Sequence, residues 1–235
     1  MRKPSVLAIL AVLSALASGT HSLPAAENGV AVAIIYDTSG SMRDPVKDAS
    51  RKSTPKYLIA NRALASVANQ IQAFATNAPG GAPRRIDAGL FVFSGDTARP
   101  AIPFGPFNAD ALRDFAAKFT NPNGNTPLGN SLAVAAKTVL ESPLPRKHIL
   151  VITDGMNTAG PQPSVVMPRL KKDAQAKQAS LSVHFVAFDV AATTFDAVKK
   201  LGATVVGAED EKQLNSQLNY ILQEKILLED EEPKK

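Results

Sequence analysis

The chain has 235 residues, of which 45% are hydrophobic and 20% charged. These proportions are ordinary for a globular protein, and the length suits one sizeable α/β domain. The sequence contains no cysteine, which excludes disulfides, thiolate metal sites and cysteine nucleophiles. The formal net charge is +5, but there is no long basic run and no Trp, so the composition gives no indication of a nucleic-acid surface.

The N-terminus has the layout of a secretory signal peptide. Arg2 and Lys3 precede an apolar run over residues 6–17, and small residues follow up to Gly19. The alternative is an uncleaved membrane anchor, but this run is short for a bilayer span of about 20 residues. We therefore expect residues 1–26 to be a signal peptide and leader. The mature protein is expected to be periplasmic or secreted, from a bacterial cell, with no stable membrane span.

In chain order, the predicted elements begin with a strand at 30–36, where VAVAIIY is a continuous apolar run typical of a strand buried on both faces. The polar stretch that follows contains Gly40, Pro45 and Pro55, which rule out a long helix. The remaining elements are a helix at 56–75, strands at 87–93 and 99–104, helices at 110–119 and 127–140, a strand at 147–153, a helix at 164–179, a strand at 181–188, a helix at 194–201, a strand at 203–206 and a helix at 210–228.

This alternation predicts a doubly wound α/β fold with a mostly parallel central sheet and helices on both faces. The segment 99–104 is flanked by prolines, which suit only an edge, so we expect it to be a short antiparallel edge strand. The domain is predicted to cover residues 27–228. The charged residues 229–235 form a C-terminal tail.

Polar side chains gather in three loops of this predicted sheet. Asp37, Ser39 and Ser41 follow the first strand, Asp154 follows the strand at 147–153, and Thr126 precedes a helix. Each loop alone could equally be a turn or a helix cap. Ligand sites in open α/β sheets form where strands end, so these residues could meet there as two carboxylates and three hydroxyls. Oxygen donors of this kind suit Mg²⁺.

The order of these motifs resembles the von Willebrand factor A family and its metal-ion-dependent adhesion site. The family pattern is Asp-x-Ser-x-Ser, then a Thr in a Thr-Pro-Leu-Gly turn, then an Asp after a later strand, and DTSGS, TPLG and ITDG match it here. The resemblance implies that Ser39 and Ser41 bind the metal directly and Thr126 directly or through water. It implies that Asp37 and Asp154 act mainly through water and through hydrogen bonds to the groups that surround the metal. The expected cation is Mg²⁺, with Mn²⁺ as a substitute and Ca²⁺ as a poorer one.

Three functions follow from this reading. The leading one is a protein that is not an enzyme and uses the cation to bind a protein partner, which supplies an Asp or Glu carboxylate to the metal. One alternative is a metal-assisted hydrolase or phosphatase on a similar sheet. The other is a structural module in which the metal only stabilises the loops. His148 and His184 lie on predicted strands with no other ligand at metal spacing, so both are expected to be core or surface residues. The basic stretch 43–56 is either a solvated loop or a surface that steers an acidic partner.

Overall fold

The computed structural model describes residues 29–76 and 84–228. The predicted signal peptide and leader (1–26) and the predicted tail (229–235) lie outside these residues. The described helices include none that is both long enough and apolar enough to cross a membrane.

The centre of the fold is a six-stranded sheet with the order β5-β4-β1-β6-β7-β8. Every neighbouring pair is parallel except β4 and β5, which are antiparallel. The strands are β1 (Val30–Tyr36), β4 (Ile86–Ser94), β5 (Thr97–Pro106), β6 (Arg146–Thr153), β7 (Ser180–Phe188) and β8 (Thr204–Ala208). This confirms the predicted mostly parallel sheet with one antiparallel edge strand. That edge strand was expected to be short, but β5 has 10 residues and extends beyond 99–104 at both ends.

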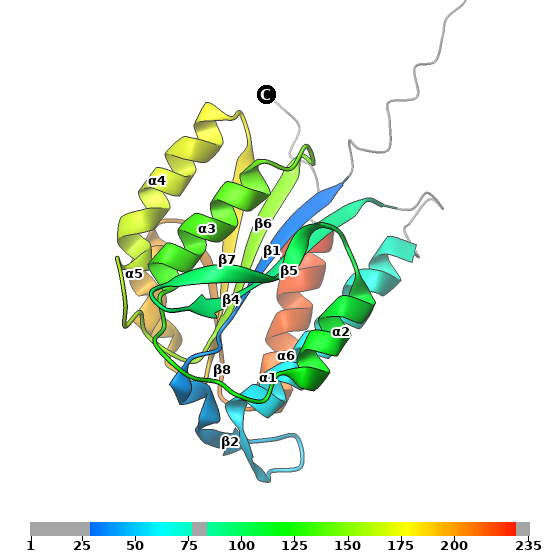
Figure 1. Cartoon of the computed structure of the whole chain (residues 1–235), viewed down its shortest axis with the longest axis vertical. Coiled ribbons are helices and arrows are strands. Elements are labelled where there is room, and N and C mark those ends of the chain that lie inside the picture. The colour runs from blue at the N-terminus through cyan, green and yellow to red at the C-terminus, as the bar shows by residue number, and fades with distance from the viewer. Residues whose placement is uncertain (1–28, 77–83, 229–235) are drawn as a thin grey trace, which may run out of the picture.

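Helices cover both faces of the sheet (Figure 1). The first face carries α1 (Lys56–Thr76), α2 (Ala109–Lys118) and α6 (Glu211–Tyr220), and the second carries α3 (Leu128–Leu140), α4 (Pro163–Ala176) and α5 (Asp196–Lys200). Side chains of β1 alternate between the two cores, because successive residues of a strand point to opposite faces. Val32 and Ile34 pack in the first core, and Ala33 and Ile35 in the second.

Between β1 and α1 the chain forms structure that the sequence reading did not predict. After a 3₁₀ turn (Gly40–Arg43), β2 (Pro45–Lys47) and β3 (Ser53–Pro55) pair as a small antiparallel hairpin. The carboxylate of Asp48 closes this hairpin by accepting hydrogen bonds from the backbone N–H groups of Ser50 and Lys52 and from the Thr54 hydroxyl. An acidic side chain that caps its own turn in this way adds local order to the short strand pairing.

The end of the chain differs from the single helix predicted over 210–228. The α-helix α6 ends at Tyr220, and residues Ile221–Leu227 continue as π-helical turns. The buried apolar residues there are five positions apart, as in Ile221 with Ile226 and Leu222 with Leu227. A π-helix bonds each residue to the one five positions away, so its wider turns keep both pairs on the same buried side.

We expect Leu218→Ala to lower the free energy of unfolding by about 3 kcal/mol, because truncating a buried Leu removes apolar contacts and leaves a cavity. Leu218 lies on α6 in the first core and is 1% exposed. Urea unfolding of the variant and of Leu228→Ala, whose side chain is 45% exposed, provides the measurement and its control. Equal losses in the two variants would contradict the packing described here.

Candidate metal centre

The candidate centre lies at the carboxyl ends of β1 and β6, where the strand order reverses. From β1 the chain passes through α1 to β4 on one side, and β6 is added later on the other side. In Figure 1 this end of β1 leads through a short loop into the 3₁₀ turn Gly40–Arg43. Connections that leave a sheet in opposite directions open a crevice between the two strands, and ligands commonly bind there.

The hydroxyls of Ser39 and Ser41 and the carboxylate of Asp154 form the centre of the site. The Oγ atoms of Ser39 and Ser41 are 3.1 Å apart, and Ser41 Oγ donates to Asp154 Oδ1 at 2.8 Å. Ser39 is almost fully buried, and Asp154 is 5% exposed. The DTSGS loop and the ITDG loop are therefore in direct side-chain contact.

Asp37 lies beneath these hydroxyls and is completely buried. Its Oδ1 accepts the backbone N–H of Ser39 at 2.8 Å, and its Oδ2 accepts the hydroxyl of Thr153 at 2.6 Å. Burial and the negative charge of Asp154 raise the pKa of Asp37 to about 6, although the bonds from Ser39 and Thr153 oppose that rise. Two carboxylates that repel each other in a buried setting would be stabilised by a cation.

Thr126 faces the same space as Ser41. A Cβ placed on Gly155 would lie 3.9 Å from Ser41 Oγ and 4.0 Å from Thr126 Oγ1, so both hydroxyls line the side of Gly155 that lacks a side chain. The Thr126 backbone is held by two hydrogen bonds with Thr158, and Gly40 N–H donates to the Gly124 carbonyl at 3.1 Å. The structure thus brings the five predicted residues Asp37, Ser39, Ser41, Thr126 and Asp154 to one end of the sheet.

The donor set of this centre consists of oxygen atoms alone. In the described part of the chain, no group of three or more His, Asp or Glu could hold a metal ion. The three hydroxyls and two carboxylates instead fit a hard cation that keeps part of its water shell, as Mg²⁺ does. Because Gly155 has no side chain, the space beside it is open to such an ion.

Lys56 is a neighbour of the site that the sequence reading missed. Its Nζ lies 2.9 Å from Asp154 Oδ2 and 3.1 Å from Asp189 Oδ2, and the residue is 5% exposed. Burial alone would lower the pKa of Lys56, but the bonds to Asp154 and Asp189 outweigh it and hold that pKa above its ordinary value. In the sequence, Lys56 belongs to the basic stretch 43–56, for which we predict a solvated loop or a surface that steers an acidic partner. Its place in the first turn of the predicted helix was a signal that Lys56 has an acidic partner, because a cation there is otherwise unfavourable.

The two strand histidines are core residues. His148 on β6 and His184 on β7 are 1% and 3% exposed, and His148 Nδ1 lies 3.2 Å from His184 Nε2. Neither histidine is among the residues gathered around Asp37.

Comparisons with known proteins agree with this architecture. The sequence profile of the von Willebrand factor type A domain matches residues 31–219. No curated protein matches the chain. Similar solved structures include the PilB minor pilin from Streptococcus sanguinis, with a TM-score of 0.61 and 15% identity. Another is the vWF domain of the type V pili tip protein Mfa5 from Porphyromonas gingivalis, with a TM-score of 0.56 and 13% identity.

A third similar structure is proximal thread matrix protein 1 from the mussel byssus with a zinc-occupied MIDAS motif, with a TM-score of 0.55 and 15% identity. These matches cover 83%, 84% and 84% of this chain, and 60%, 95% and 48% of the pilin, the pili tip domain and the mussel protein. The chain therefore spans only part of the pilin and of the mussel protein, and identities this low show a shared fold alone. The profile match covers most of the sequence and the fold agrees with it, so the chain belongs to the von Willebrand factor type A domain family.

Proposed function

We propose that this chain is an exported protein that binds a divalent cation, Mg²⁺ by preference, and uses it to bind an acidic protein partner. The metal residues are Asp37, Ser39, Ser41, Thr126 and Asp154. The observation that carries the proposal is the meeting of two hydroxyls, those of Ser41 and Thr126, at the open side of Gly155, with the Ser39 hydroxyl 3.1 Å from that of Ser41 and the buried carboxylate of Asp37 bonded to Ser39 N–H. The zinc-occupied MIDAS motif of the similar mussel protein supports a divalent cation at this position of the fold.

Each residue has a distinct task in this proposal. Ser39, Ser41 and Thr126 supply neutral oxygen donors. Asp37 holds the first loop in place through Ser39 N–H and is itself oriented by Thr153. Asp154 orients Ser41 Oγ and adds negative charge. When bound, the cation offers an open coordination position to a carboxylate, because the neutral hydroxyls leave much of its charge uncompensated.

A hydrolase or phosphatase would need a base or nucleophile beside the metal. The carboxylates that could serve already have other partners, since Asp37 accepts from Ser39 and Thr153 and Asp154 accepts from Ser41 and Lys56. This favours a binding site over an enzyme. Export is supported by the signal-peptide pattern of residues 1–26 and by the pilus proteins among the similar structures.

The purified chain, used as bait on a bacterial envelope fraction, tests the proposal when Mg²⁺ and chelator are compared in parallel. The proposal expects a protein partner to be retained with Mg²⁺ and lost with chelator. A structural metal site would give a different result, because chelator would then lower the melting temperature and leave the partner bound.

Ser39→Ala and Asp37→Ala are each expected to weaken partner binding by about 100-fold or more, since one removes a donor and the other the group that orients it. The measurement is calorimetry of the partner in Mg²⁺ with each variant. Ser164→Ala on α4 and the exposed Asp114→Ala on α2 are the matched controls and should bind as the wild type does. Undiminished affinity in Asp37→Ala would refute the adhesion mechanism.

A further inference from the structure

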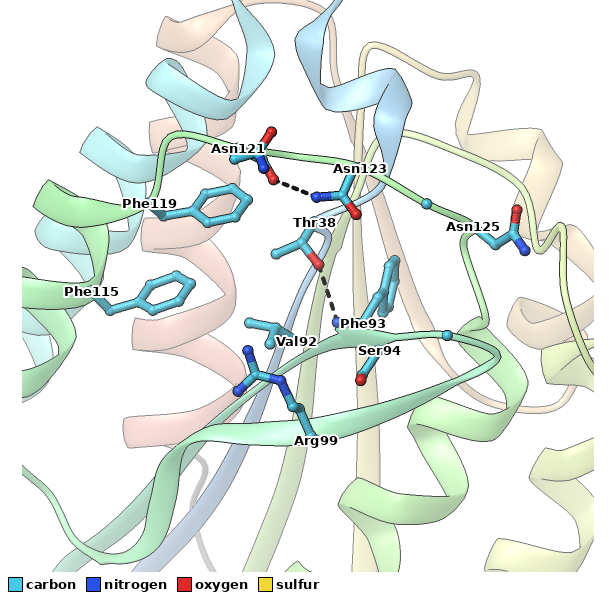
Figure 2. Close-up of a pocket in the computed structure, with 12 residues that line it drawn as sticks. Thr38, Val92, Phe93, Ser94, Arg99, Phe115, Phe119, Asn121, Asn123 and Asn125 are labelled. Atoms are coloured by element: carbon cyan, nitrogen blue, oxygen red, sulfur yellow. Dashed lines mark hydrogen bonds between the residues drawn. The ribbon is translucent and has the colours of Figure 1, made fainter.

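A pocket of about 410 Å³ lies beside the candidate metal centre, between the ends of β4 and β5, the C-terminal part of α2 and the loop that leads to Thr126. The rings of Phe115 and Phe119 line one side, and Asn121 and Asn123 line the rim (Figure 2). The volume is within the range of small-ligand sites, which run from about 300 to 1,000 Å³.

The pocket shares its wall with the metal loops. Thr38, which stands between Asp37 and Ser39, lines it, and the Thr38 carbonyl accepts the N–H of Asn123 at 2.7 Å. Gly124 also lines the pocket and accepts the N–H of Gly40. A peptide bound by one side chain at the metal centre therefore needs only to cross this rim to place a second side chain in the pocket.

Arg99 gives the pocket its charge. Figure 2 shows its side chain reaching from β5 toward the space that Thr38 and Phe115 border. Beyond the pairing of its backbone with β4, the side chain of Arg99 forms no hydrogen bond or ion pair with another described residue, and none of the residues that line the pocket is acidic. Arg43 adds a second positive charge at the rim, where it donates to the side-chain carbonyl of Asn121 at 3.0 Å.

We propose that this pocket is a second subsite, which binds an acidic side chain of the same partner. This inference rests on the proposed function: one partner carboxylate goes to the metal centre and a neighbouring Asp or Glu places its carboxylate on Arg99. The guanidinium offers a planar pair of donors that matches a carboxylate. The Phe115 and Phe119 rings give the methylene stem of that residue an apolar surface. The recognised element is then a short segment with two carboxylates at a set spacing.

Capped synthetic peptides test this directly. Each peptide carries one Asp, then a spacer of zero to about four glycines, and then Glu, Gln or Phe. The spacer spans the rim at about 3.3–3.6 Å per residue. Calorimetry or NMR titration with saturating Mg²⁺ gives the affinities. At one spacing we expect the Glu peptide to bind about 10-fold more tightly than its Gln counterpart, as a charged hydrogen-bonded pair would provide.

Variants of Arg99 tie that gain to the pocket. Arg99→Gln should remove the preference for Glu over Gln, while Arg169→Gln, an 85% exposed arginine on α4, should keep it. Arg99→Glu should prefer the same peptide with Lys in place of Glu. Arg99 is exposed, so these changes should not disturb the fold.

The outcomes separate the two proposals. If no peptide binds more tightly with Mg²⁺ than with chelator, the proposed function fails and this inference fails with it. If binding depends on Mg²⁺ but the Glu and Gln peptides bind with equal affinity at every spacing, only the second subsite is refuted. A gain for Phe over Glu, or a preference for Glu that persists in Arg99→Gln, would likewise overturn it.

Discussion

The protein is expected to lose about 3 kcal/mol of folding free energy between pH 6.5 and pH 4.5, with the buried pair His148 and His184 as the cause. Burial lowers the pKa of His148 to about 3, aided by the positive charges of His184 and Arg146. Burial and the charge of Lys225 lower the pKa of His184 to about 4. In the unfolded chain both histidines titrate near 6.5.

The sign follows from which state takes up protons. Below pH 6.5 the unfolded chain binds a proton at each histidine and the folded chain does not, so stability is complete above pH 6.5 and falls as the pH drops toward 4. Each histidine contributes at most about 1.4 kcal/mol per pH unit. Asp37 acts in the opposite direction in the metal-free protein, because its raised pKa of about 6 lets the folded state bind a proton first. On acidification the two histidines therefore destabilise the folded state more than Asp37 stabilises it, and a net loss of folding free energy remains.

Urea unfolding in chelator at a series of pH values measures this loss. In the variant that combines His148→Asn with His184→Gln, the amides stand in for the ring nitrogens that meet at 3.2 Å and neither residue titrates. Its stability should stay level or rise as the pH falls from 6.5 to 4.5. A loss equal to that of the wild type would show that the histidine pair is not the cause.

Lys56→Met is expected to lower the free energy of unfolding by about 3–5 kcal/mol in chelator, because it leaves a buried carboxylate without its partner. The carboxylate left unpaired is that of Asp154, whose side chain is 0% exposed. The Asp189 side chain is 39% exposed, so water can replace most of the interaction that it loses. With Mg²⁺ the deficit should become smaller, since a bound cation would replace the lost positive charge beside Asp154.

Lys52→Met is the matched control, because Lys52 is an exposed residue of the nearby hairpin. Urea unfolding of the two variants, with and without Mg²⁺, gives the comparison. If Lys56→Met and Lys52→Met lose the same free energy, Lys56 does not serve as the counter-charge of the site. If Mg²⁺ leaves the Lys56→Met deficit unchanged, the link between that charge and the metal centre is wrong.

The sheet could be predicted because its central strands are continuous apolar runs. The predicted strands at 30–36 and 147–153 appear as β1 (Val30–Tyr36) and β6 (Arg146–Thr153). The hairpin of β2 and β3 could not be found in this way, because its order comes from hydrogen bonds to one carboxylate, that of Asp48, and not from a hydrophobic period. The π-helical end of the chain was missed because a five-residue spacing of apolar side chains also fits an irregular α-helical stripe.

The candidate site could be predicted in its residues but not in its charge balance. Asp37, Ser39 and Asp154 follow strand ends, and such loops meet at one edge of a parallel sheet. Lys56 could not be assigned, because its partners Asp154 and Asp189 follow β6 and β7 and only the folded chain brings them to the start of α1. Arg99 was missed for a similar reason, since its pocket is built from β4, β5, α2 and two separate loops.

Mn²⁺ binding to the purified chain, followed by electron paramagnetic resonance, tests whether these residues form a metal centre. We expect one bound Mn²⁺ per chain in the wild type, displaced by Mg²⁺, and its loss in Ser39→Ala and in Asp37→Ala. Both variants should keep the far-UV circular dichroism of the wild type. Mn²⁺ binding of equal strength in the wild type and both variants, or no binding to the folded wild type, would contradict the assignment of these residues to a metal centre.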